Sequence, residues 1–180
     1  MKKLLFIFLM SIPAIIVQAQ NDSIAVSQIK ELGVYYLRSD TIVKIEPIMT
    51  EGTKGKGNPF SIKTSIVYEG ENSNHVFQDK PTFYIFIPSE YKNRINAKQF
   101  RLVTLDSKKG QRTLVTASAS VVGAKTGAKT KPLEIIKLSD ECYKAFYDEI
   151  MPSGHYGIFY NYAGGIPLKL YDFDIISNGQ

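Results

Sequence analysis

The stretch Thr82-Phe83-Tyr84-Ile85-Phe86-Ile87 is apolar on both faces of an extended chain, because large aromatic or aliphatic side chains occupy consecutive positions. Short continuous apolar runs of this kind are typical of a strand that is buried between two layers. We therefore predict that this strand forms the centre of the protein core.

Other strand-like runs, rich in β-branched and aromatic residues, lie on both sides of this segment. Gly33 to Arg38 and Thr41 to Thr50 flank Ser39-Asp40, which predicts a hairpin with a tight turn. Phe100 to Asp106 and Arg112 to Ala119 flank a loop that contains a glycine, which predicts a second hairpin. Four more strands are predicted, over Phe60 to Tyr68, Leu133 to Leu138, His155 to Tyr160 and Leu168 to Ile175.

This series of short, closely spaced strands predicts an all-β fold. The architecture we expect is an antiparallel β-sandwich, or alternatively a small open barrel, with at most short helices. One short helix is predicted over Asp140 to Ile150, because apolar residues recur at helical spacing behind Ser139, a good N-cap. Asn21 to Leu32 is consistent with a short helix or an edge strand, and Ser89 to Ala97 with a short turn.

The first nineteen residues have the pattern of a secretory signal peptide. Lys2 and Lys3 precede an almost unbroken apolar run, and Val17-Gln18-Ala19 fits the small-residue site that signal peptidase requires. A membrane anchor is the alternative, but the run is shorter than the roughly 20 residues of a spanning helix. We predict cleavage after Ala19, which leaves one β-rich domain over residues 20–180. This domain is expected to be exported, periplasmic or secreted, without stable insertion into a membrane.

Composition excludes several classes of protein. The 180 residues, 44% of them hydrophobic, are enough for one domain with a real core. Loss of Lys2 and Lys3 lowers the formal net charge from +5 to +3, which is too mild to indicate a nucleic-acid partner. The single cysteine, Cys142, permits no intramolecular disulfide and is not placed for lipid attachment. A nucleophilic role would need a basic partner, and nothing in the sequence ties His75 or His155 to it, so we predict a buried structural thiol.

Two segments are predicted to be exposed loops. The repeat Gly123-Ala124-Lys125-Thr126-Gly127-Ala128-Lys129-Thr130 is similar to a phosphate-binding loop, but such a loop has glycine directly before its Lys-Thr pair, and alanine stands there in both copies. A solvated basic loop is therefore expected. The segment Glu51 to Pro59 is also predicted to be a loop, because three glycines and a proline do not favour a strand.

Asp172 and Asp174 offer the one weak indication of a metal. They share a strand face by the two-residue period, and Ca²⁺ prefers grouped oxygen ligands. Two carboxylates without further acidic ligands do not make a site, so we expect a solvent-facing strand surface. No metal and no cofactor are predicted.

The ordered set Phe83 to Ile87, Phe100 to Leu105, Lys108 to Arg112, Gly154-His155-Tyr156 and Tyr171-Asp172-Phe173 resembles a family of poorly characterised exported bacterial proteins. In that family a final hairpin reads Pro-Gly-Glu-Tyr, a short apolar strand and Phe-Asp-Phe-Gly. The resemblance covers roughly Pro81 to Ile175 and implies a β-rich, exported or envelope-associated domain of unsettled role. It supplies no catalytic residues to carry over to this chain. The chain departs from the family pattern at Ser153, His155 and Asp174, where the family usually has Pro, Glu and Gly.

Two functional hypotheses remain. The first is a non-enzymatic binding or envelope-interaction module that presents Glu51 to Pro59 and Gly123 to Lys131 to a protein, peptide or glycan. The second is a hydrolase whose site is assembled from His155 with Asp172 or Asp174. The scarcity of His and Cys favours the first, and no catalytic residue is predicted. The candidate ligand-binding residues are His155, Asp172, Asp174, Lys125 and Lys129.

Overall fold

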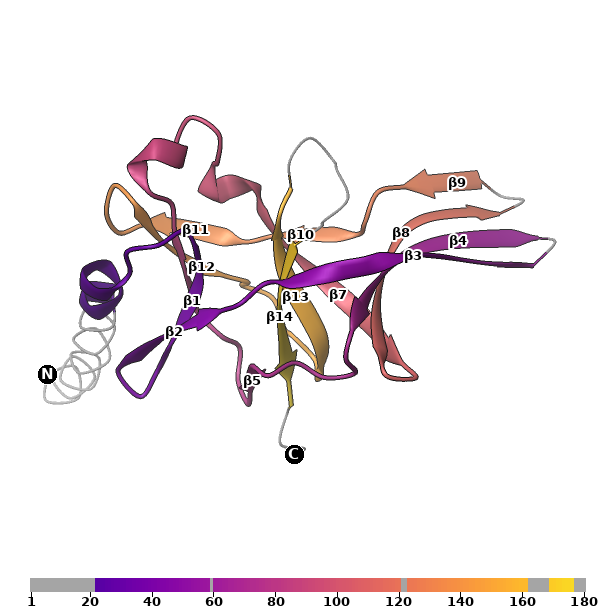
Figure 1. Ribbon diagram of the computed structural model, residues 1–180, viewed down its shortest axis with the longest axis horizontal. Helices are drawn as coiled ribbons and strands as arrows, with labels where there is room; N and C mark the ends of the chain where they lie inside the picture. The colour runs from indigo at the N-terminus through magenta and orange to yellow at the C-terminus, as the bar shows by residue number, and fades with distance from the viewer. Residues whose placement is uncertain (1–21, 59, 121–122, 162–168, 177–180) are drawn as a thin grey trace, which may run out of the picture.

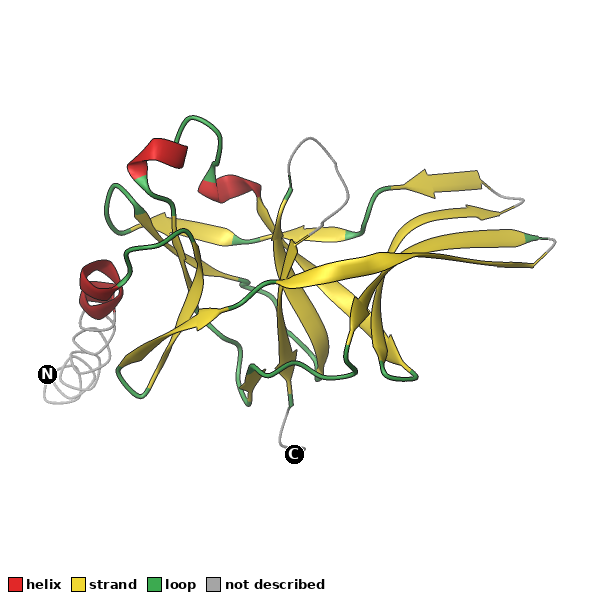
Figure 2. Ribbon diagram, in the orientation of Figure 1, coloured by secondary structure: helices red, strands yellow, loops and turns green. Residues whose placement is uncertain are grey.

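The computed structural model describes residues 22–58, 60–120, 123–161 and 169–176 (Figure 1). The predicted signal peptide, residues 1–19, lies outside this part of the chain. The described residues are mostly β, with one helix over residues 22–28 and two short 3₁₀ helices, η1 (Ser89–Tyr91) and η2 (Ala97–Gln99) (Figure 2). The prediction of an all-β fold with at most short helices is confirmed.

The described residues form fourteen strands in two sheets. In chain order they are β1 (Gly33–Arg38), β2 (Thr41–Ile45), β3 (Ile48–Asn58), β4 (Ser61–Glu69), β5 (Val76–Phe77), β6 (Phe83–Phe86), β7 (Phe100–Lys108), β8 (Gln111–Ser120), β9 (Gly123–Thr126), β10 (Thr130–Pro132), β11 (Glu134–Lys137), β12 (Cys142–Phe146), β13 (Gly154–Tyr160) and β14 (Lys169–Ile175).

The smaller sheet has the order β11-β12-β6-β1-β2, and every neighbouring pair is antiparallel. All four residues of β6, at its centre, are buried, as the sequence predicts. Phe83 and Ile85 pack into the core between the two sheets. Tyr84 and Phe86, on the opposite face, pack against Ala25 of the N-terminal helix and its neighbours. The strand β6 is therefore apolar on both faces because the larger sheet covers one face and the N-terminal helix covers the other.

The larger sheet closes on itself into a barrel. Hydrogen-bonded pairs join β7, β13, β14, β3, β4 and β8 in that order, and β8 pairs again with β7. Its interior is filled by buried side chains that include Tyr68, Phe159 and Leu170. The outer face of β7, β13 and β14 packs against the smaller sheet, where Phe173 lies 4.9 Å from Phe83 between ring centroids. The structure thus contains parts of both predicted alternatives, two packed sheets and a barrel, but the barrel is closed and not open as predicted.

Four strands run on past the barrel and form a projection that we call the arm (Figure 1). It consists of residues 52–58 of β3, residues 61–65 of β4, residues 117–120 of β8 and all of β9. The predicted loop over Glu51 to Pro59 is therefore wrong for residues 51–58, and Pro59 lies outside the described residues. The predicted loop over Gly123 to Lys131 is confirmed only at residues 127–129, between β9 and β10. The glycines are tolerated because β4, rich in β-branched residues, pairs with β3 on one side and with β8 on the other. The prediction that these segments are solvated holds, because most of their residues are exposed.

The predicted helix over Asp140 to Ile150 is also wrong, because this segment contains β12. Cys142 packs beneath the N-terminal helix while Ala145 packs into the core between the sheets, so the apolar spacing reflects a strand that is buried on both faces. The Ser139 hydroxyl oxygen accepts hydrogen bonds from the backbone N–H groups of Glu141 and Cys142. The Ser139 side chain therefore stabilises the turn that precedes β12 and does not cap a helix.

The predicted hairpin around Ser39-Asp40 is confirmed, and both turn residues have positive φ. The predicted strand from Thr41 to Thr50 is interrupted at Glu46-Pro47, so that β2 belongs to one sheet and β3 to the other. The second predicted hairpin is formed by β7 and β8.

Cys142 is fully buried, as predicted for a structural thiol, and burial raises its pKa to about 11. We expect its alkylation by iodoacetamide at pH 8 to be slower by about 100-fold in the native protein than after denaturation in guanidinium chloride, because only the thiolate reacts. Mass spectrometry of samples quenched over time measures both rates. Equal rates in the two states would show that the thiol is accessible and contradict this placement.

Candidate functional site

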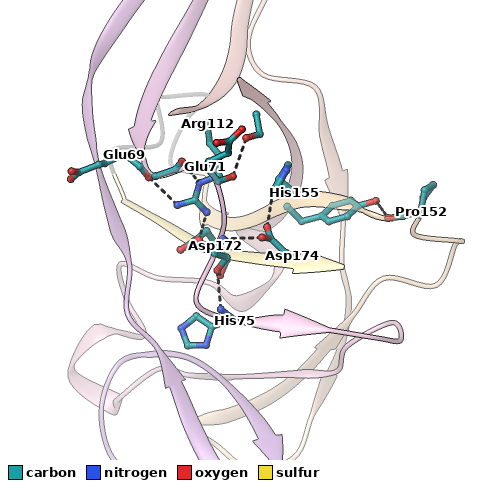
Figure 3. A network of polar contacts seen from close by, with 12 residues as sticks. Glu69, Glu71, His75, Arg112, Pro152, His155, Asp172 and Asp174 are labelled. Carbon is teal, nitrogen blue, oxygen red and sulfur yellow. Dashed lines mark hydrogen bonds and ion pairs between the residues drawn. The ribbon is translucent and has the colours of Figure 1, made fainter. Parts of the chain in front are cut away.

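The two acidic residues that the sequence places on one strand face lie at one end of the barrel (Figure 3). Asp172 and Asp174 alternate along β14 with Phe173, which points into the core between the sheets. Both residues are buried, with 4% and 5% of their surface exposed. The prediction of a shared face agrees with this register, but the expected solvent-facing surface is wrong, because the segment before β5 packs over this end of the barrel.

Asp172 forms a buried ion pair with Arg112 of β8. Nη1 of Arg112 donates to Oδ2 of Asp172, Nε donates to the Gly70 carbonyl oxygen at 3.1 Å, and Nη2 donates to the Glu69 carbonyl oxygen at 3.0 Å. All three guanidinium nitrogens therefore have acceptors in the protein. Such a pair is tolerated in a barrel interior because its hydrogen-bonding capacity is satisfied when water is removed.

Asp174 has different partners. Its Oδ2 accepts the backbone N–H of Ser73 at 2.9 Å, and its Oδ1 lies 2.8 Å from Nδ1 of His155. The Ser73 hydroxyl donates to the Asp172 carbonyl oxygen at 3.0 Å, and the Asp174 N–H donates to the carbonyl oxygen of His75 at 2.8 Å. These bonds fasten the segment between β4 and β5 onto β14.

The chemistry open to this cluster is limited by these contacts. Asp172 is neutralised by Arg112 and Asp174 is shared by Ser73 and His155, so neither carboxylate is arranged as a ligand for a cation. Within the described residues, no group of three or more His, Cys, Asp or Glu side chains is placed to hold a metal ion. The His155 imidazole, with 25% of its side chain exposed, is the most accessible member of the cluster.

The second histidine is placed as a packing residue. The ring of His75 meets that of Tyr36 edge-on at 5.6 Å between centroids, and its Nδ1 lies 3.4 Å from the Tyr36 hydroxyl oxygen. Burial lowers the pKa of His75, which favours the neutral ring in this apolar contact.

A cleft of about 560 Å³ lies beside β5 and is lined in part by Tyr36, Phe77 and Tyr84. None of the predicted ligand-binding residues lines it. A smaller cleft of about 320 Å³ lies between β7 and β8 and is lined in part by Lys129 and Lys131. Lys129 is the one predicted ligand-binding residue that borders either cleft.

Lys125 lies on the arm, where it is paired with Ser118 near the C-terminal end of β8. Arg112 lies near the N-terminal end of the same strand. The predicted ligand-binding residues therefore do not form one site. His155 and Asp174 are in contact, Asp172 is paired with Arg112, and Lys125 and Lys129 lie elsewhere. The two segments that the sequence assigns to partner binding, in contrast, meet in the arm as β3 and β9, joined through β4 and β8.

The strand register of the arm gathers lysines on one face. Lys56 of β3 lies opposite Lys63 of β4, Lys63 lies opposite Ser118 of β8, and Ser118 lies opposite Lys125 of β9. Directly opposed residues in antiparallel strands point to the same face of the sheet. Lys54, two residues before Lys56, shares this face. We call these four lysines the lysine face.

The other face of the arm is uncharged. Its residues, again set by the register, are Thr53, Gly55, Gly57, Ile62, Thr64, Ala117, Ala119, Ala124 and Thr126. Within the described residues no carboxylate lies within ion-pairing distance of Lys56, Lys63 or Lys125. The positive charges of these three lysines are therefore not neutralised by any carboxylate in the part of the chain that the structure describes.

The sequence contains the signal for this surface in its charge distribution. Residues 52–68 and 107–133 contain nine Lys and Arg and no Asp or Glu. The rest of the chain holds all 17 acidic residues against 13 basic ones. The mild net charge of the whole chain does not show that basic and acidic residues lie in different segments. The two basic segments are brought together by pairing between strands that are distant in sequence.

Comparison of the chain with protein-family models, curated proteins and solved structures finds no match in any of the three. The resemblance to a family of exported bacterial β-rich proteins therefore stays a prediction. No helix in the described part of the chain has both the length and the apolar character needed to cross a membrane.

Proposed function

We propose that this protein is a non-enzymatic binding module of the cell envelope that holds an anionic partner on the lysine face of its arm. The observation that carries the proposal is the row of Lys56, Lys63 and Lys125 across the sheet, which no carboxylate of the described residues neutralises. Positive charge concentrated on one surface attracts anionic partners and accelerates their association.

The arm also holds these charges in place. Lys56 and Lys63 lie on the long paired strands β3 and β4, and β8 and β9 extend the same ladder. A binding surface on paired strands is more rigid than one on loops, so less conformational entropy is lost when a partner binds. On an exported chain, a partner with acidic groups is an envelope glycan, a peptide, a protein or a lipid surface rather than nucleic acid.

The hydrolase alternative is supported by one contact, that between His155 and Asp174. An imidazole oriented by a carboxylate can act as a general base when a nucleophile or water lies at its other nitrogen. The same carboxylate, however, also accepts the Ser73 N–H and fastens a segment of the fold. This structural use of Asp174, and the pairing of Asp172 with Arg112, favour the binding module.

The proposal predicts that neutralising two arm lysines weakens binding of a polyanion. The Lys56→Gln/Lys63→Gln variant is expected to raise the Kd for fluorescently labelled polyglutamate by about tenfold at low ionic strength, and added salt should abolish this difference. Fluorescence anisotropy measures the binding. Because both side chains are exposed, far-UV circular dichroism should be unchanged.

A matched control removes the same charge elsewhere. Lys92→Gln/Lys98→Gln changes two exposed lysines of the segment that joins β6 to β7, and its Kd should equal that of the wild type. If both double variants lose affinity equally, binding follows net charge and the assignment to the arm is wrong. Absence of polyglutamate binding by the wild type at low salt would refute the proposed function.

A further inference from the structure

The end of the arm exposes two large apolar side chains. Phe60, at the turn between β3 and β4, is 69% exposed, and Ile62, at the start of β4, is 59% exposed. The Phe60 N–H donates to the Asn58 side-chain oxygen at 2.9 Å, which helps to hold the turn. Ile62 lies on the face opposite the lysines, where it is paired with Gly57 and Ala119.

The lysines stand at a common distance behind this end. Lys56 lies two residues before Asn58 on β3, Lys63 lies two residues after Ser61 on β4, and Lys125 lies two residues after Gly123 on β9. With a rise of about 3.3 Å per residue, each lysine is attached about 7 Å behind the last paired position of its strand. The arm therefore ends in an apolar tip, Phe60 and Ile62, with basic residues directly behind it.

This combination distinguishes between anionic partners. A soluble polyanion interacts with the lysines alone and gives no role to Phe60 or Ile62. The headgroup region of a bilayer accepts both kinds of side chain, since apolar and aromatic groups enter the acyl boundary to about 5–10 Å while lysines contact anionic headgroups. The spacing between tip and lysines matches this depth.

We propose that the tip of the arm docks on an anionic lipid bilayer surface, with Phe60 and Ile62 in the interfacial layer and Lys56, Lys63 and Lys125 against the headgroups. The inference rests on the proposed function, because it names the anionic partner of the same lysines. Docking of this kind requires no spanning segment. It requires only that the tip and the lysine face reach the bilayer together, and Figure 1 shows the arm projecting away from the smaller sheet.

The first test uses the protein recovered after export and vesicles of phosphatidylcholine with or without a third of phosphatidylglycerol. We expect cosedimentation with the anionic vesicles only. The Phe60→Ser/Ile62→Thr variant should lower the partition coefficient by about tenfold while its affinity for polyglutamate is unchanged. The matched control Ile136→Thr/Ile150→Ser alters two exposed apolar residues outside the arm, one on β11 of the smaller sheet and one between β12 and β13, and should bind vesicles as the wild type does.

The second test reports the position of the tip directly. The chain contains no tryptophan, so Phe60→Trp supplies a single fluorophore at the tip. Its emission is expected to shift to the blue when anionic vesicles are added, whereas Tyr91→Trp, in η1, should show no shift. Polyglutamate should shift neither.

The outcomes separate the two proposals. If the tip variant binds vesicles normally and Phe60→Trp shows no blue shift, the docking inference is overturned, while binding of polyglutamate through the lysines leaves the proposed function intact. If neither vesicles nor polyglutamate bind the wild type, both proposals fall together.

Discussion

Replacing Arg112 with methionine is expected to lower the free energy of unfolding by about 3–5 kcal/mol, because the change leaves Asp172 as an uncompensated charge inside the barrel. Both side chains of this pair are almost fully buried, with 3% and 5% exposed. The substitution also removes the hydrogen-bond donors to the backbone carbonyl oxygens of Glu69 and Gly70. Urea denaturation followed by far-UV circular dichroism measures the effect.

A second substitution shows whether the unpaired charge of Asp172 causes the loss of stability. In the Arg112→Met/Asp172→Leu variant no buried charge remains from this pair, and at least half of the lost stability should return, because apolar replacements of buried pairs are often nearly neutral. Lys137→Met, which breaks the exposed pair with Asp140, should have no measurable effect. If Arg112→Met is as stable as the wild type, the pair is not a structural requirement of the barrel.

The strands themselves were predictable because their signals are local. The apolar run at Phe83 to Phe86 identifies the central strand of the smaller sheet, and the residues Ser39 and Asp40 identify a turn with positive φ. The burial of Cys142 was predicted on another ground, the lack of any basic residue tied to it in the sequence, and it is confirmed. The strand and the turn depend on a few consecutive residues and on the chemistry of their side chains.

The errors arise where tertiary contacts override local preference. Apolar residues between Cys142 and Phe146 match a helix, but this segment becomes a strand because β6 and β11 offer ladders on both sides. Gly55 and Gly57 predict a loop, yet they belong to a strand because β4 supplies a long complementary edge. The pattern within one segment does not show whether such a partner strand is present beside it.

The candidate sites likewise have some features that follow from local sequence and others that depend on tertiary contacts. That Asp172 and Asp174 share a face follows from the period of a strand. Their burial depends on Arg112, which lies 60 residues away from Asp172 in the chain, and on the segment before β5 that packs over them. The lysine face depends on three separate strand pairings, and only their register shows that Lys56, Lys63 and Lys125 stand in one row.

The buried glycine of β13 sets the packing inside the barrel, and its replacement is expected to have the second large effect on stability. A Cβ atom added at Gly157 would lie 2.5 Å from Cδ1 and 2.6 Å from Cγ of Leu170, a side chain with no exposed surface. Leu170 is packed in the buried cluster inside the barrel, and moving its side chain would disturb that packing, so Gly157→Ala should lower the free energy of unfolding by about 1–3 kcal/mol. Urea denaturation measures this loss.

The steric cause can be isolated with a double-mutant cycle and a matched glycine. In a Leu170→Ala background, which itself forms a cavity in the barrel, Gly157→Ala should cost close to nothing, because the atoms that it would meet are gone. Gly55→Ala, on the arm, adds a methyl group where no atom lies within 4 Å and should leave stability unchanged or slightly raised. If Gly157→Ala is as harmless as Gly55→Ala, the barrel interior is loosely packed around Leu170, and the close approach of β13 to that side chain is not what requires a glycine at this position.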